Sequence, residues 1–174
     1  MHIRTLLVLA FAVGLIAPNA AAQSDLTGTW AVDRTRSDDL EPWRNIELRI
    51  DATDELVTVA RTLSAGRRNV RQDSIAVATD GSRTEHAMEN SAKWLEQPHL
   101  GVFLEDSKQV LSATWLAPKR ALEIMSTQTV QTSQAAIDVD IRSTYILSND
   151  GTEMTVIVDR SSRPGQLTYV YTRQ

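Results

Sequence analysis

Two histidines are the side chains best suited to acid–base chemistry near neutral pH. His86 is flanked by Glu85 and Glu89. Neither lies in a recognised metal-ligand spacing, and a zinc or iron site needs three or four convergent ligands. No Gly-x-Ser-x-Gly pattern or glycine-rich phosphate loop occurs either. We therefore expect no metal and no cofactor, and His86 and His99 are the candidates for any catalytic role.

Aromatic side chains are the other group that could meet a ligand, because each combines a large apolar body with a polar tip. Trp94, Trp115 and Tyr145 all fall within or beside predicted strands of the second half of the chain. They are our candidates for ligand contacts, and packing in the core is the alternative role for all three.

The composition excludes several classes of protein. The 174 residues include no cysteine, so disulfides, thiol catalysis, cysteine-ligated metals and anchoring through a lipid-modified cysteine are ruled out. The formal net charge is −4, which does not favour a nucleic-acid partner. A basic group, Arg67, Arg68 and Arg71, is either a solvated hairpin end or a rim that attracts an anionic ligand.

Residues 1–22 have the features of a signal peptide. A short basic beginning is followed by an apolar run of about a dozen residues and by Ala20-Ala21-Ala22. The run is shorter than the roughly 20 residues that span a membrane. We expect cleavage before Gln23, one domain over residues 23–174 with no transmembrane segment, and a periplasmic or secreted monomer. Losing Arg4 changes the net charge from −4 to −5.

The secondary-structure elements that would position these residues are all predicted to be strands. Asn45–Asp51 alternates apolar and polar residues with a period of two, and Leu56–Leu63 is rich in β-branched residues. We expect these two to form a hairpin. Further hairpins are expected to join Ser74–Thr79 to Arg83–Met88 through Asp80-Gly81, and Leu100–Leu104 to Val110–Leu116.

The remaining expected strands are Leu26–Val32, Leu122–Gln131, Ile137–Leu147, Met154–Asp159 and Leu167–Arg173. No helical periodicity interrupts the series. The fold class is therefore all-β, an antiparallel up-and-down meander of about 8–10 strands, since turn signals separate short extended runs throughout. Closing that meander into a barrel would remove both exposed edges.

Three segments resemble secreted bacterial lipocalin-like (calycin-type) β-barrel proteins: LTGTWAVDRTRS at the start, YILSNDGTEMTV at Tyr145–Val156, and YVYTR at Tyr169–Arg173. In that family the tryptophan of Gly-x-Trp plugs the closed end of the barrel, and an arginine near the last strand covers its ring. The resemblance implies these structural roles for Gly28, Trp30 and Arg173.

The leading functional prediction is an exported soluble barrel that binds a small apolar or amphipathic molecule, because eight to ten strands leave room for one small ligand. One alternative is an enzyme that uses the barrel cavity, with His86 or His99 as the acid–base group and Arg71 or Glu85 assisting. Another alternative is a periplasmic factor that binds proteins through an exposed apolar patch.

Overall fold

The structure is a computed structural model that describes residues 25–40, 42–87, 102–103, 108–131 and 134–174. Trp94, His99 and the expected signal peptide lie outside the described residues. The described part contains strands and no helix. The strands are β1 Gly28–Val32, β2 Asn45–Ala52, β3 Leu56–Ser64, β4 Val70–Ala78, β5 Thr84–Ala87, β6 Val102–Phe103, β7 Lys108–Ala117, β8 Ala121–Gln131, β9 Ala136–Leu147, β10 Glu153–Arg160 and β11 Arg163–Arg173.

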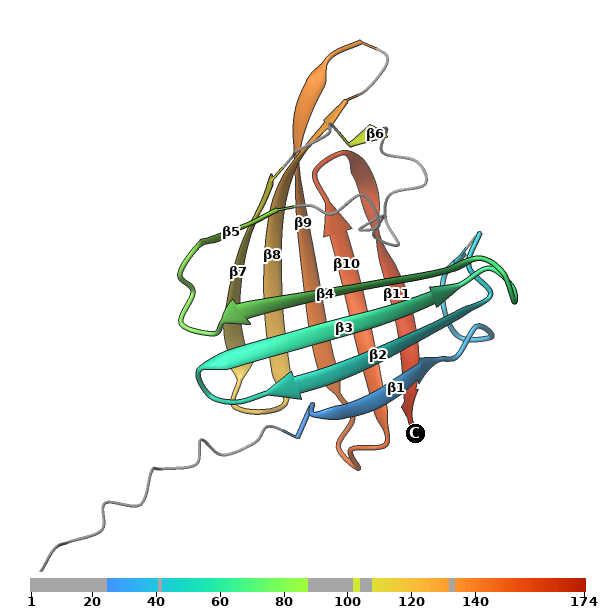
Figure 1. Ribbon diagram of the computed structural model, residues 1–174. Helices are drawn as coiled ribbons and strands as arrows, with labels where there is room; N and C mark the ends of the chain where they lie inside the picture. Colours follow the sequence, from blue (N-terminus) through green and yellow to red (C-terminus); the bar gives the residue numbers. More distant parts are fainter. Residues whose placement is uncertain (1–24, 41, 88–101, 104–107, 132–133) are drawn as a thin grey trace, which may run out of the picture.

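All the strands belong to one antiparallel sheet, in the order β4-β3-β2-β1-β11-β10-β9-β8-β7-β5, with β6 paired to β8. Neighbours in the sheet are mostly neighbours in sequence, as in a meander. Three pairings are exceptions: β5 with β7, β6 with β8, and the first strand with the last, where β1 pairs with β11 through Trp30 opposite Arg173. In Figure 1, β1 to β4 cross in front of the upright strands β7 to β11.

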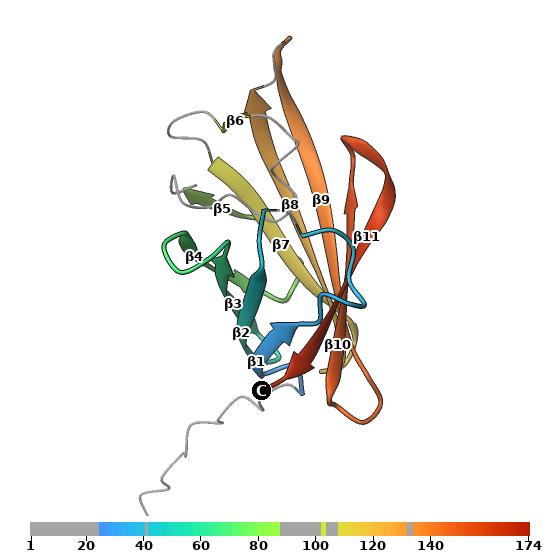
Figure 2. The same ribbon diagram turned by 90° about the vertical axis from the view of Figure 1, so that its right-hand side faces the viewer.

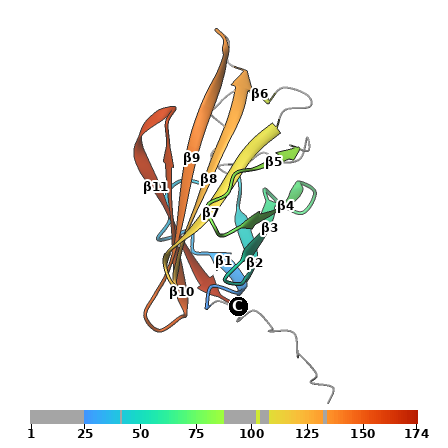
Figure 3. The same cartoon turned by 90° about the vertical axis from the view of Figure 1, so that its left-hand side faces the viewer.

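The sheet curls until its two ends meet, so that the barrel is nearly closed. Figures 2 and 3 show β2 to β4 facing β7 and β8 from the opposite layer. Just after β4, Asp80 forms an isolated bridge with Thr114 of β7, and the Gly81 amide donates to the Ala113 carbonyl at 2.9 Å. The predicted all-β barrel meander is confirmed.

Two of the predicted hairpins are wrong. β5 pairs with β7 instead of β4, because residues 80 and 81 join the ladder of β7 and carry the chain from one layer to the other. β6 pairs with the end of β8, where Val102 lies opposite Gln131, and not with β7. In both cases the prediction assigned the partner strand by proximity along the sequence.

The core lies inside the barrel and follows the strand alternation. In β10 every second residue is buried, and β2 and β9 show the same period. The largest fully buried apolar side chains are Trp30, Tyr169, Tyr171, Leu26, Ile46, Ile50, Leu63, Leu111, Leu122 and Met154. In the described residues we find no helix with the length and apolar character needed to cross a membrane.

Candidate ligand-binding site

The inner wall formed by β7, β8 and β9 carries two of the predicted ligand contacts. Trp115 lies opposite Leu122, and Leu122 lies opposite Tyr145. Residues directly opposite each other share a face of the sheet, so these three form one row, which we call the aromatic row. Tyr145 is buried, and Trp115 is half-buried against the core.

Small side chains follow the aromatic row along the same wall. The next row crosses Ala113, Ile124 and Ser143, and the one after it contains Ser126 between Leu111 and Ile141. Ala113 and Ser143 are buried, so these positions contribute little volume to the interior. The wall is therefore less filled there than at the aromatic row.

The far end of this wall is polar. Gln109 of β7 lies opposite His86 of β5 on one side and opposite Gln128 of β8 on the other. We call His86, Gln109 and Gln128 the polar row. Gln109 and Trp115 are six positions apart along β7, which corresponds to about 20 Å at roughly 3.3 Å per residue.

The polar row has unused hydrogen-bonding capacity. Gln109 is 3% exposed and Gln128 is 1% exposed. No hydrogen-bond partner in the described part of the chain reaches Gln109 Oε1, either amide atom of Gln128, or the buried His86 Nε2. Leaving one such buried group unpaired costs about 1–3 kcal/mol. A fold that keeps several of them side by side has a local deficit that a bound polar group would remove.

The charged side chains of the interior are already engaged. Arg61 of β3 lies opposite Asp73 of β4, and its Nε donates to Asp73 Oδ1 at 2.7 Å while its Nη2 donates to Oδ2. The Arg61 side chain is 2% exposed. Arg160, the last residue of β10, is also buried and has interactions of its own. In the described interior, unpaired polar atoms lie on the uncharged amides of Gln109 and Gln128, on His86, and on the indole nitrogens of Trp43 and Trp115.

The proposed helpers of an enzymatic His86 are not gathered around it. Glu85 precedes His86 in β5 and so points to the other face. Its carboxylate pairs with Lys108 at 2.8 Å in an exposed position, and the hydrogen bond from Lys108 lowers the pKa of Glu85. Arg71 is exposed on β4, as are Arg67 and Arg68 in the preceding turn. The described residues hold no group of three His, Cys, Asp or Glu side chains that could bind a metal.

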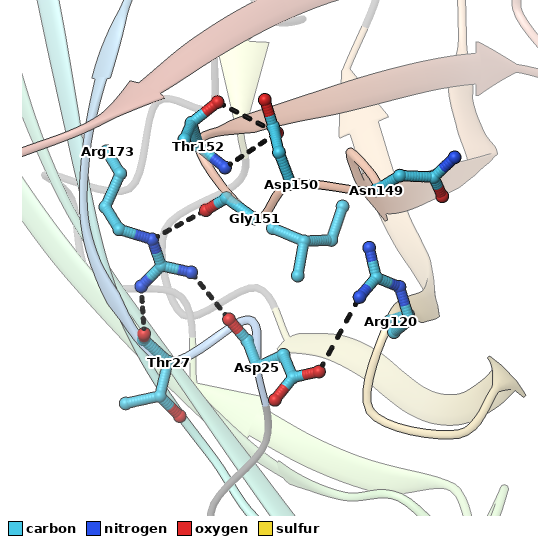
Figure 4. A pocket seen from close by; sticks show the side chains of 9 residues that line it. Asp25, Thr27, Arg120, Asn149, Asp150, Gly151, Thr152 and Arg173 are labelled. Carbon is cyan, nitrogen blue, oxygen red and sulfur yellow. Dashed lines mark hydrogen bonds and ion pairs between the residues drawn. The ribbon is translucent and has the colours of Figure 1, made fainter.

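A recess lies outside the barrel, at the end where the first and last strands meet. This recess has a volume of about 650 Å³ and is lined by Asp25, Thr27, Arg120, Leu147, Asn149, Asp150, Gly151, Thr152 and Arg173. Figure 4 shows its two arginines turned toward backbone and carboxylate oxygens of the recess itself. Arg120 donates to the Ser148 carbonyl and lies 3.8 Å from the Asp25 carboxylate. The charged groups of the recess thus hold neighbouring segments of the chain together.

Arg173 is the centre of this closure. Its guanidinium donates to the carbonyls of Gly151 at 2.9 Å, Thr27 at 2.8 Å and Asp25 at 2.6 Å. Its central carbon lies 4.2 Å from the centroid of the Trp30 ring. A Cβ on Gly28 would come within 2.7 Å of Arg173 Nη1. The structure thus brings together the three residues to which the resemblance assigns a structural role.

The hairpin beside the recess is held by a carboxylate. Asp150 accepts hydrogen bonds from the Ser148 hydroxyl at 2.7 Å and from the Thr152 amide and hydroxyl at 3.1 and 2.9 Å. These bonds, that of Ser148 first, lower the pKa of Asp150 from 3.8 to about 2. Because the Asp150 carboxylate and both arginines are engaged in holding the recess together, we treat the interior wall as the candidate site and the recess as structural.

Sequence reasoning found part of this wall and missed the rest. It selected Trp115, Tyr145 and His86, which face the interior, and Trp94 and His99, which lie outside the described residues. It missed Gln109 and Gln128. The signal that could have found them is the phase of the alternation, since each lies two, four or six residues from an apolar side chain that faces inward.

Comparison with known proteins gives no family for this chain. No family model matches it, and no curated protein matches it. Among solved structures it is similar to the fatty-acid-binding protein isolated from Manduca sexta L, with 8% sequence identity and a TM-score of 0.47. That similarity covers 86% of this chain and 99% of the other chain.

Proposed function

We propose that this protein binds a small amphipathic molecule inside the barrel. The apolar part of the ligand lies along the wall between the aromatic row and the small side chains of Ala113, Ser126 and Ser143. Its polar group lies at the polar row. The molecule is carried and not transformed, because the described surroundings of His86 place no second acid–base group on its face of β5.

The observation that carries this proposal is the contrast between the two ends of one wall. Trp115 and Tyr145 offer large aromatic rings at one end, where Trp115 Nε1 is the unpaired polar atom. Three unpaired amide atoms of Gln109 and Gln128 lie about 20 Å away at the other end. Ligand sites in proteins combine mostly apolar linings with a few placed polar groups. The wall has that composition.

Native mass spectrometry of the protein purified from an exporting host, against a denatured control, tests the proposal directly. We expect an additional small-molecule mass that disappears on denaturation. The released compound should contain an apolar part. A protein that carries no adduct, and that after delipidation also takes up none of a panel of long-chain amphiphiles, would contradict the proposal.

Two single-residue variants then locate the ligand. Trp115→Ala should weaken binding at least about tenfold, because burying an aromatic side chain against a ligand is worth roughly 1.5–3 kcal/mol. Leu116→Ala removes an apolar side chain that is 56% exposed and should leave affinity unchanged. Equal losses in both variants would place the ligand elsewhere.

The site is proposed to work outside the cytoplasm, as a monomer in the periplasm or the medium. Support comes from the signal-peptide pattern of residues 1–22 and from the absence of cysteine. N-terminal sequencing of the protein recovered from the periplasmic fraction should begin at Gln23. Recovery of the intact chain from the cytoplasm of a bacterial host would contradict this part of the proposal.

A further inference from the structure

The unpaired atoms of the polar row define what a ligand must offer. Gln128 has an unpaired donor, Nε2, beside an unpaired acceptor, Oε1, and Gln109 adds a second acceptor across the ladder. Because both amide atoms of Gln128 are unpaired, its need for one donor and one acceptor holds for either orientation of the amide. His86 Nε2 donates or accepts according to its tautomer.

A carboxylate fits this set poorly. It has only acceptor oxygens, so it could meet Gln128 Nε2 but would turn lone pairs toward the two amide oxygens. Both buried cations that face the interior in the described residues, Arg61 and Arg160, already have interaction partners. Neither of these two cations would therefore be available to pair with an anion at the polar row.

An ammonium group fits no better. It has only donors, so Gln128 Nε2 would remain unpaired.

We infer that the polar row selects an uncharged ligand group that both donates and accepts hydrogen bonds, of which a carboxamide is the best match. An N–H of that group donates to Gln128 Oε1 or Gln109 Oε1, and its carbonyl accepts from Gln128 Nε2. The pairing is the reciprocal one between two amides. This inference rests on the proposed function, since it names the class of amphipathic ligand that the same wall holds.

Three probes with one alkyl chain test it: a saturated long-chain primary amide, the carboxylate of the same chain, and the corresponding alkylammonium. Affinities for the delipidated protein are measured by isothermal titration calorimetry at neutral pH. We expect the amide to bind about tenfold more tightly than either charged probe, because each buried hydrogen-bonding group left unpaired costs about 1–3 kcal/mol, a range that includes that factor.

Gln128→Leu should reduce the affinity for the amide at least about tenfold while changing that for the carboxylate little. Gln72→Leu makes the same replacement at an exposed position of β4 and should change neither. Gln128→Met, which keeps the length of the side chain, repeats the test if the leucine variant does not fold. The comparison of the three probes on the unmodified protein needs no variant.

The outcomes distinguish this inference from the proposed function on which it rests. The inference is overturned if the carboxylate or the ammonium binds as tightly as the amide. It is also overturned if neither Gln128 variant changes the affinity for the amide. Either result leaves the proposed carrier function standing. Failure of all three probes to bind overturns both.

Discussion

Arg173, in the last strand, lies over the ring of Trp30, in the first, with 4.2 Å between the guanidinium carbon and the ring centroid. The two residues are also opposite each other in the ladder between β1 and β11. The same guanidinium donates to three carbonyls, those of Gly151, Thr27 and Asp25. One side chain therefore joins the two ends of the chain and closes one end of the barrel.

Replacing Arg173 should destabilise the barrel without changing its ligand preference. Arg173→Ala loses a cation–π contact worth about 0.5–2 kcal/mol and the hydrogen bonds of the guanidinium, for a total of roughly 2–3 kcal/mol. Arg173→Lys keeps the charge but not the planar fork, so its loss should be intermediate. Urea denaturation followed by far-ultraviolet circular dichroism measures both. Equal stability of wild type and Arg173→Ala would show that the closure is not energetically important.

A methyl group on Gly28 should cost less stability when Arg173 is absent. Its φ of +152° disfavours other residues, and a Cβ there would lie 2.7 Å from Arg173 Nη1. Gly28→Ala should cost roughly 1–3 kcal/mol, part of it strain and part the displaced guanidinium. In the Arg173→Ala background the second part vanishes, so the cycle of single and double variants should show coupling of about 1 kcal/mol. Additive losses would mean that backbone strain alone is responsible.

The strands and their inward faces were largely predictable from the sequence, because a period of two is visible wherever one face is apolar. Ile46, Leu48 and Ile50 alternate with charged residues, and all three are buried. The Asp150-Gly151 turn was equally clear, because glycine supplies the positive φ of 72° that it needs there.

The candidate site was harder to predict from the sequence, because it depends on pairings between distant segments. Gln109 and Gln128 become neighbours only through the register of β7 with β8, and His86 joins them only because β5 pairs with β7. The sequence predicted β4 as the partner of β5, which would have put His86 elsewhere. A polar residue at an inward position also resembles an outward one when only its type is considered.

The buried pair of Arg61 and Asp73 should behave differently when one or both partners are removed. Asp73→Ala leaves a guanidinium that is 2% exposed without its carboxylate, which should cost about 3–5 kcal/mol. Arg61→Leu with Asp73→Leu removes both charges and should cost clearly less than that single change. Equilibrium urea denaturation provides the values.

The exposed pair of Glu85 and Lys108, with side chains 63% and 65% exposed, is the matched control for this test. Glu85→Ala should change stability little, because solvent screens such pairs. If Asp73→Ala were as mild as Glu85→Ala, the interior around Arg61 would have to be hydrated. That result would also weaken the electrostatic argument against a charged ligand.

Acid should remove the contribution of Asp150 to stability only at low pH, because the pKa of its carboxyl is lowered in the folded protein. Hydrogen bonds from Ser148 and Thr152 lower the pKa of Asp150 from 3.8 to about 2, and bonds from Thr35 and Arg36 lower that of Asp33 to about 2. A carboxylate with a depressed folded-state pKa stabilises the fold above its unfolded value, and that contribution is lost as the pH falls through the folded value. The window is therefore pH 4 down to about 2.

Asp150→Asn isolates this contribution, because the variant cannot carry the charge. Its melting temperature should lie below that of wild type at pH 7, and the difference should shrink between pH 4 and about 2, where wild type also becomes neutral at this position. Asn149→Ala, an uncharged exposed neighbour in the same turn, should show a difference that does not vary with pH. A gap between Asp150→Asn and wild type that stayed constant down to pH 2 would mean that the carboxylate acts through the geometry of its hydrogen bonds and not through its charge.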